Sequence, residues 1–372
     1  MKANNWKADT RYVHAGAHPD PSTGAIMTPI YQTSTYVQEA PGVNQGFEYA
    51  RSQNPTRKAL EEALAVLEGG NYGLAFSSGV AATDAVIKLL SAGDEVVCGN
   101  DMYGGTYRQF TKIFQRLGIT FHMVNTTDAT NVAKAITPKT KVFMFSSPCN
   151  PSGAVYSKAE LEALANLFKK YPHITILPDE IYEYINFIGK HESIAQFSEI
   201  KDQVIVINGL SKGFAMTGWR LGYTASNITL AKAMEKLQGQ FTSGTCSITQ
   251  KAAVAALVGD LKPSLEMTEE FTRRRATTLK LVSEVPGFKC YAPEGAFYVF
   301  PDVSSYYGKS DGTQTITNAA DFSMYLLNTA HVSSVMGDAF GEPNCVRFSF
   351  ANSMPNIGKA WARIKEALAK LK

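Results

Sequence analysis

A single lysine stands among glycines and apolar residues in the stretch GLSKGFAMTGWRLGY, which begins at Gly209. Lys212 directly follows the β-branched run VIVINGL, and Arg220 comes eight positions later. A lysine at the end of a strand suits Schiff-base chemistry, because partial burial lowers its pKa and makes the amine a nucleophile or base. Taken alone, Lys212 is better explained as a surface lysine that flanks a strand.

Two further apolar runs end in polar residues that suit the same chemistry. ITILPDEIYEY ends a predicted strand with Asp179 and places Tyr182 three residues later. A carboxylate there can keep a pyridinium nitrogen protonated, so that the ring acts as an electron sink. A helix N-cap is the alternative interpretation of Asp179. SSPCNPSGAVYS offers Asn150 as a hydrogen-bond donor, although a simple Asn-Pro turn explains it equally.

The stretch YGLAFSSGVAATDAVIKLL predicts a strand, a turn and a helix. Ser78, Gly79 and Val80 would then present backbone N–H groups at a helix N-terminus, which is an anion site. Arg220 can give the same phosphate a charge-assisted fork. The alternative is an ordinary strand-to-helix turn.

The elements that must position these residues alternate along the chain from about residue 55 to 225. Seven short apolar runs are separated by amphipathic stretches, a pattern that predicts an α/β fold with a mainly parallel sheet and helices on both faces. Ligands of such sheets bind at the carboxyl ends of the strands. Helix boundaries are indicated by Asn54 and Pro55 and by the capping-box pair Ser157 and Glu160.

Pattern changes along the chain predict three parts. Residues 1–45 hold four prolines and little periodicity, which indicates an N-terminal arm. Residues 46–255 form the predicted large domain. Residues 256–372 begin with a long helical stretch and continue with short strands and a closing helix, which predicts a smaller C-terminal α+β domain.

The amino-acid composition indicates which binding partners and which cellular compartment to expect. The formal charge of the 372 residues is +3, which gives no reason to expect nucleic acid or an anionic membrane surface. The five cysteines are odd in number and form no CxxC pair, so we expect a reducing, cytoplasmic location. No stretch reaches the roughly 18 apolar residues of a membrane span. The six histidines lack ligand spacing, and no metal site is expected.

From about residue 130 to the end, the chain resembles class I aminotransferases of the aspartate aminotransferase type, which are fold-type I enzymes that use pyridoxal phosphate (PLP). The resemblance rests on GLSKGFAMTGWRLGY, PDEIYEY, SSPCNPSGAVYS and VRFSFAN. It implies Lys212 as the internal aldimine, with Ser211 beside it, and Asp179 on the pyridine nitrogen. It further implies the remaining contacts: Tyr182 and Asn150 on the ring oxygen, Arg220 on the phosphate, and Arg347 as a bidentate clamp for the substrate α-carboxylate, with Asn150 also near the substrate. A buried structural ion pair is the alternative for Arg347.

The first 130 residues resemble a different fold-type I family, the PLP enzymes of Cys/Met metabolism, which include cystathionine γ-lyases and γ-synthases. The motifs are TRYVHAGAHPDPSTGAIMTPIYQTSTY, YARSQNPTRKALEEALAVLEGG, FSSGVAATDAV and DMYGGTYRQF. This resemblance implies that Tyr103 stacks on the cofactor ring and that Ser78, Gly79 and Val80 hold the phosphate. It also implies that Tyr49 and Arg51 reach the phosphate of the partner subunit in a homodimer.

The two resemblances predict a mosaic whose boundary lies between about residues 125 and 145. Because the lysine, the aspartate and the carboxylate clamp are of the aminotransferase type, we expect transfer of an amino group between an aspartate-like amino acid and a 2-oxo acid. A carbon–sulfur lyase or γ-replacement enzyme acting on cystathionine-like substrates is the second hypothesis. A PLP-binding fold without activity is the third.

Overall fold

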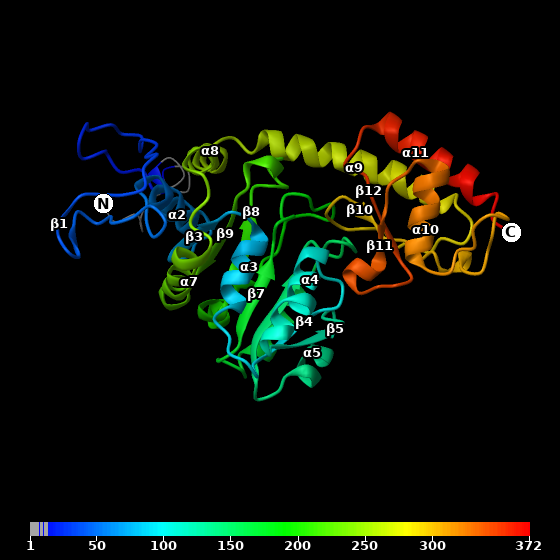
Figure 1. The fold of residues 1–372 in the computed structure, drawn as a ribbon, viewed down its shortest axis with the longest axis horizontal. Coiled ribbons are helices and arrows are strands. Elements are labelled where there is room, and N and C mark those ends of the chain that lie inside the picture. Colours follow the sequence, from blue (N-terminus) through cyan, green and yellow to red (C-terminus); the bar gives the residue numbers. More distant parts are fainter. Residues whose placement is uncertain (1–6, 8–9, 11–13) are drawn as a thin grey trace.

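The computed structural model describes residues 7, 10 and 14–372. The other residues of the predicted N-terminal arm, 1–6, 8–9 and 11–13, lie outside the described part. The rest of the arm contains a short antiparallel pair, β1 (Gln38–Ala40) and β2 (Val43–Asn44). Figure 1 shows this arm at one end of the molecule and the C-terminus at the other.

A seven-stranded sheet forms the centre of the molecule, with strand order β3-β9-β8-β7-β6-β4-β5. All pairs are parallel except those of β9, which runs antiparallel to both neighbours. This confirms the predicted α/β class and the mainly parallel sheet. The strands are β3 (Tyr72–Phe76), β4 (Glu95–Gly99), β5 (Thr120–Val124), β6 (Thr140–Ser146), β7 (Thr175–Asp179), β8 (Val206–Gly209) and β9 (Gly222–Ser226).

Helices cover both faces of this sheet. One face packs against α3, α4 and α7 through residues such as Val86, Phe110 and Met234. The other packs against α5 and α6 through Val132 and Leu161. The helices are α2 (Pro55–Leu67), α3 (Gly79–Ile87), α4 (Gly104–Lys112), α5 (Ala129–Ala135), α6 (Lys158–Phe168), α7 (Ile228–Phe241) and α8 (Ser247–Val258).

The predicted helix boundaries are confirmed at two places. Asn54 caps α2 by accepting a hydrogen bond from the Thr56 N–H, and Pro55 is the first helical residue. Ser157 and Glu160 form the capping box of α6. Each cap supplies a partner for a backbone N–H that the helix itself leaves unpaired, an effect of about 1 kcal/mol.

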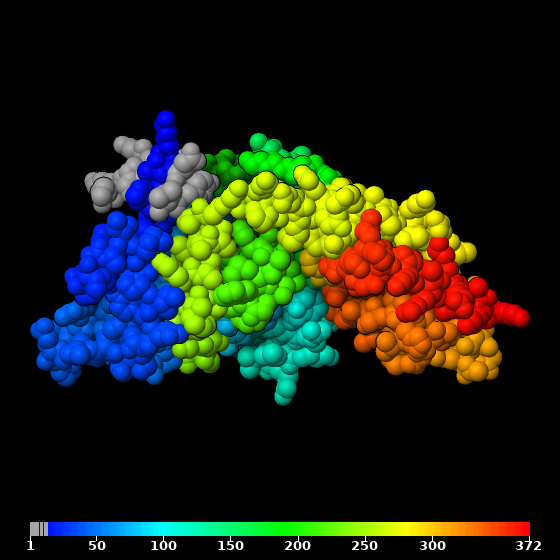
Figure 2. Space-filling model, turned by 90° about the horizontal axis from the view of Figure 1, so that it is seen from above, coloured from blue at the N-terminus to red at the C-terminus, as the bar shows by residue number. Residues whose placement is uncertain are grey.

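The C-terminal part is built around a second, antiparallel sheet with strand order β10-β12-β11. Its strands are β10 (Tyr298–Val299), β11 (Val335–Met336) and β12 (Val346–Ser349), and its helices are α9 (Lys262–Ser283), α10 (Ala319–Tyr325) and α11 (Met354–Leu368). Figures 1 and 2 both show α9 extending from the large sheet toward this C-terminal part. The content matches the predicted α+β unit, while the boundary at residue 256 remains a prediction. Within the described ranges, no helix is both long enough and apolar enough to cross a membrane.

Candidate active site

A cavity of about 310 Å³ lies at the carboxyl ends of β3, β6, β7 and β8. Volumes of this size suit a small organic ligand. The cavity brings together most of the residues singled out from the sequence. They are Ser78, Gly79, Val80, Tyr103, Asn150, Asp179, Tyr182, Ser211, Lys212, Arg220 and Arg347.

The turn between β3 and α3 forms one wall of the cavity. Ser78 is the N-cap of α3 and accepts a hydrogen bond from the Ala81 N–H. The N–H groups of Gly79 and Val80 have no partner within the helix and carry the positive end of its dipole. Gly222 of β9 lets the sheet approach this turn, because a Cβ there would lie 2.4 Å from the Gly79 nitrogen. The turn therefore suits a phosphate group.

Lys212 and Asp179 are both partly buried at this edge of the sheet. Burial lowers the pKa of Lys212, and the nearby charges of Arg347 and Arg220 lower it further, while Asp179 acts in the opposite direction. Burial also raises the pKa of Asp179 from 3.8 to about 6, although the Ile181 N–H stabilises the carboxylate from 3.2 Å. A cationic ring nitrogen beside Asp179 would supply the positive charge that stabilises the buried carboxylate.

Arg220 has a left-handed backbone conformation with φ of 57°, which is uncommon for a residue with a side chain. The hydroxyl of Thr245 donates to the Arg220 carbonyl over 2.8 Å, and that of Thr249 donates to the Trp219 carbonyl over 3.0 Å. These bonds hold the turn, and the Arg220 side chain remains exposed at the cavity.

Arg347 projects from β12 into the same cavity. Its guanidinium donates to Oδ1 of Asn150 over 2.7 Å. It also lies over the rings of Tyr298 and Phe340, with 4.3 Å and 4.8 Å from Cζ to the ring centroids. No carboxylate is within ion-pair distance of Arg347 among the described residues. The alternative of a structural ion pair therefore has no partner in this part of the chain.

Tyr298 lines the cavity but was not identified from the sequence. Its hydroxyl lies 3.0 Å from that of Tyr182, and its ring covers Arg347. One side chain thus touches both a predicted cofactor ligand and the predicted substrate clamp. The run GAFYVF contains Tyr298, but nothing in its spacing distinguishes this tyrosine from core aromatic residues.

Tyr103 precedes the first residue of α4 and lines the cavity with 40% of its surface exposed. Gly105 leaves space for its ring, since a Cβ there would lie 2.4 Å from Tyr103 Cε1. The placement suits a ring that stacks on a planar ligand.

Tyr49 and Arg51 are not among the residues that line the cavity. The Arg51 guanidinium donates to the Gly239 carbonyl and lies 5.3 Å from the centroid of the Tyr49 ring. A single chain therefore does not bring these two predicted phosphate ligands to its own site.

Comparison with known families gives a result that agrees with the two resemblances. Residues 9–182 match the family described as Cys/Met metabolism PLP-dependent enzyme. The match continues beyond the predicted boundary at residues 125–145.

Relatives of the aminotransferase type match a larger share of the chain. A bifunctional aspartate aminotransferase and glutamate/aspartate-prephenate aminotransferase of Petunia hybrida is 43% identical over 244 residues, which make up 64% of this chain and 50% of that protein. An aspartate/prephenate aminotransferase of Nitrosomonas europaea is 41% identical over 240 residues, 63% of this chain and 60% of that protein. The chain thus spans 50% and 60% of the length of these two relatives.

Solved structures extend the similarity to most of the fold. An aspartate aminotransferase from Rhizobium meliloti superposes with a TM-score of 0.78 and 31% identity, covering 91% of this chain and 84% of that one. An aromatic aminotransferase from Pyrococcus horikoshii superposes with a TM-score of 0.74 and 29% identity, covering 85% of each chain.

Proposed function

Because the chain belongs to the fold-type I enzymes that depend on PLP, we propose that it is an aminotransferase that moves an amino group between an amino acid and a 2-oxo acid. An aspartate-like amino donor is part of the proposal. It is supported by the names of the relatives, which are aspartate/prephenate and aspartate aminotransferases. The free cysteines in the described part of the chain support a reducing, cytoplasmic compartment.

The residues around the cavity fit the cofactor. The N–H groups at the start of α3 and the exposed Arg220 can hold the phosphate, and Asp179 can accept the ring N–H. Tyr103 can stack on the ring. Tyr182 and Asn150 can donate to the ring oxygen, and Lys212 with its lowered pKa can bond to the aldehyde carbon.

When bound, PLP supplies an aldehyde carbon for the amine and a ring that takes up the electron pair left by the departing Cα proton. Once the substrate amine replaces Lys212 at that carbon, the freed Nζ would be the base that takes this proton and returns it, because burial and the two nearby arginines favour its neutral form. Asp179 must stay ionised to hold a proton on the ring nitrogen, and that proton in turn stabilises the buried carboxylate.

Arg347 is the residue that orients the substrate. Its planar fork can bind an α-carboxylate bidentately, and the rings of Tyr298 and Phe340 restrict its orientation. Asn150 holds the guanidinium from the side of the large sheet, so the clamp spans both parts of the molecule. The absence of any described acidic partner for this half-buried arginine is the observation that carries the proposal, since it leaves the cation for a substrate carboxylate.

The proposal includes a homodimer in which Tyr49 and Arg51 reach the phosphate of the partner's site. It is supported by their absence from the lining of their own cavity and by the apolar surface of the arm that precedes them in the chain. Ile26, Met27 and Val37 are 74%, 61% and 88% exposed, and burial against a second copy would remove them from water.

A single half-reaction tests the activity. The PLP-loaded protein is mixed with L-aspartate and no 2-oxo acid, and the bound cofactor is identified by mass. Appearance of pyridoxamine phosphate supports the aminotransferase, provided that the Lys212→Ala variant gives none. Retained PLP with release of 2-oxo acid and ammonia from L-cystathionine would instead support the carbon–sulfur lyase, which the family match of residues 9–182 favours. If neither occurs, the inactive PLP-binding fold is the better description.

A further inference from the structure

A buried arginine in the first turn of α2 has no role in the chemistry described above. The Arg57 side chain is only 3% exposed, and buried guanidinium groups are costly unless they are paired. Its N–H groups donate to the backbone carbonyls of Ser52 and, over 3.4 Å, of Arg51. Its Nε lies 3.5 Å from Glu61 one turn later on the same helix. Arg57 therefore holds the backbone of the segment that carries Tyr49 and Arg51.

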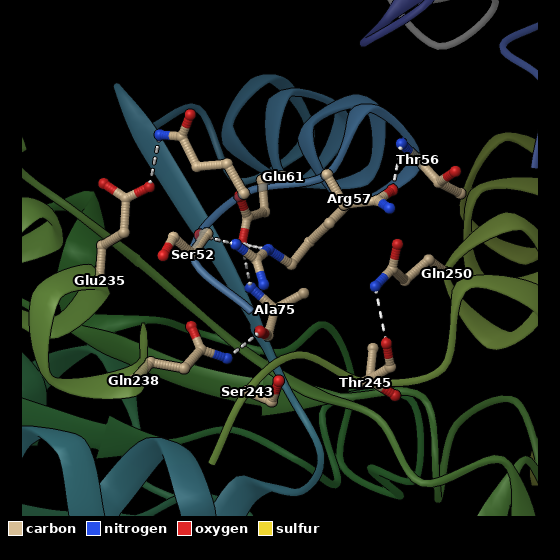
Figure 3. A network of polar contacts seen from close by, with 12 residues as sticks. Ser52, Thr56, Arg57, Glu61, Ala75, Glu235, Gln238, Ser243, Thr245 and Gln250 are labelled. Atoms are coloured by element: carbon tan, nitrogen blue, oxygen red, sulfur yellow. Dashed lines mark hydrogen bonds and ion pairs between the residues drawn. The ribbon is translucent and has the colours of Figure 1, made fainter. Parts of the chain in front are cut away.

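Glu61 connects this arginine to the edge of the seven-stranded sheet. Strand β3 is an edge strand, and one side of its backbone has no neighbouring strand. Glu61 accepts the Ala75 N–H over 3.0 Å, and Gln238 of α7 donates to the Ala75 carbonyl over 2.7 Å. These two side chains take the place of a further strand and satisfy both groups. Figure 3 shows Arg57 and Glu61 lying between Ser52 and Ala75.

The same segment is tied to α7 at two more points. The Arg51 guanidinium donates to the Gly239 carbonyl, and Gln53 donates to Glu235 over 2.9 Å. Gly244 leaves the space that Arg57 occupies, because a Cβ at this position would lie 2.7 Å from Arg57 Nη1. Residues 49–53 are thus held from α2, from α7 and, through Glu61, from the strand that ends three residues before the phosphate turn at Gly79.

We propose that Arg57, held by Glu61, is a positioning residue that places residues 49–53 so that Tyr49 and Arg51 reach the phosphate in the partner's site. This inference rests on the homodimer of the proposed function. Arg57 donates to two carbonyls and faces one carboxylate at once, and its planar guanidinium fixes the directions of these contacts as a lysine ammonium does not. Its effect therefore appears in the partner's cofactor site and not in its own.

The first test compares two neighbouring glutamates of α2. Glu61→Gln keeps the shape of the side chain but removes the charge that faces Arg57, and we expect PLP to leave the enzyme roughly tenfold faster. Glu62→Gln is the matched control, because Glu62 forms its ion pairs with His18 over 2.8 Å and with Lys58 over 3.9 Å and forms none with Arg57. Equal PLP release from the two variants would overturn the proposal. If Glu61→Gln does not fold, Gly244→Ala displaces Arg57 without removing either charge and is expected to act in the same direction.

The decisive test separates the partner's site from the subunit's own. Hybrid dimers are purified with two different tags, one subunit carrying Glu61→Gln and the other Lys212→Ala. Borohydride reduction then fixes PLP on the one remaining Lys212, and subunit masses report how much stays bound during dilution. The intact Lys212 lies in the Glu61→Gln subunit. The residues 49–53 that reach its cofactor site come from the other subunit, in which Glu61 is intact. We expect retention of PLP as in the wild type.

Fast release of PLP in this hybrid would overturn the proposal, because Glu61 would then act within its own subunit. Arg51→Ala distinguishes this failure from a failure of the homodimer itself. If Arg51→Ala homodimers retain PLP as the wild type does, the contact across subunits is wrong, and the present proposal is overturned with it. A third outcome would separate the two proposals. Arg51→Ala homodimers would release PLP faster, hybrids of Arg51→Ala and Lys212→Ala subunits would retain it, and Glu61→Gln would have no effect. In that case the contact across subunits is right and only the role of Arg57 and Glu61 is wrong.

Discussion

We expect the ring of Tyr298 to strengthen the binding of a substrate carboxylate to Arg347. It lies 4.3 Å from the Arg347 guanidinium, and Phe340 covers the same group from 4.8 Å. An arginine over a partly desolvated ring gains about 1–2 kcal/mol. Tyr298→Leu lets the guanidinium leave its binding orientation when no ligand is present, and restoring that orientation costs up to this energy. A carboxylate that binds Arg347 should therefore bind up to about 5- to 30-fold more weakly, at 1.4 kcal/mol per tenfold change.

Tyr298→Phe separates the ring from the hydroxyl. It keeps the ring over Arg347 but removes the contact with the Tyr182 hydroxyl, 3.0 Å away. We expect carboxylate affinity to change less than about threefold, while the free energy of unfolding falls by about 1 kcal/mol. Tyr306→Phe is a matched control, because this buried tyrosine donates to the Pro286 carbonyl over 2.6 Å and lies outside the cavity lining.

Affinity is measured by titrating the PLP-loaded enzyme with succinate, which has carboxylates but no amine, and following the cofactor absorbance. The expected order of affinity is wild type, then Tyr298→Phe close behind, then Tyr298→Leu clearly weaker. Equal affinity of the leucine and phenylalanine variants would refute the reasoning, since the ring would then contribute nothing to the clamp.

Three further predictions concern the cofactor site. Lys212→Ala should lower the rate of the half-reaction at least about 1,000-fold, as measured by stopped-flow absorbance, because the base for the Cα proton is lost. Arg220→Lys should weaken PLP binding about tenfold in an equilibrium titration, since a lysine cannot form the bidentate fork; unchanged affinity would remove Arg220 from the phosphate site. Burial raises the pKa of Asp179 from 3.8 to about 6, so the protonated side chain contributes stability to the apoprotein below pH 3.8, and this contribution is lost as pH rises through 6. Asp179→Asn should therefore stabilise the apoprotein against thermal unfolding by up to about 3 kcal/mol at pH 8 and have little effect below pH 4, although it impairs the loaded enzyme. An Asp179→Asn apoprotein that unfolds at a lower temperature than the wild type at pH 8 would contradict this prediction.

Two contacts in the candidate site join residues that are far apart in the sequence. Asn150 and Arg347 meet although they are 197 positions apart in the sequence, and Tyr182 meets Tyr298, which is 116 positions away. The sequence motifs predicted that Asn150, Tyr182 and Arg347 lie near the ligand, and they did not identify Tyr298. They could not predict which side chains touch, because contacts across the two sheets depend on how the C-terminal part packs against the large sheet.

Residues that are close together in the sequence are sufficient to predict the class of fold and the local geometry at the strand ends. Alternating runs predicted the parallel sheet, and Asn54, Ser157 and Glu160 marked helix starts, because caps and hydrophobic periodicity act over a few residues. The parallel strands then place Ser78, Asp179 and Lys212 at one edge, since their carboxyl ends meet there. The roles of these residues and the boundary of the mosaic remain predictions.

The partners of the charged groups, in contrast, come from segments that are distant in the sequence. The sequence predicts that a helix begins at Pro55, two residues before Arg57, and the structure buries the Arg57 side chain against the carbonyls of the preceding segment. Arg347 meets two rings and an amide in place of a carboxylate. The energy of a charge depends on its burial and on neighbours that the chain brings together from afar, and neither is encoded in the residues adjacent to it in sequence.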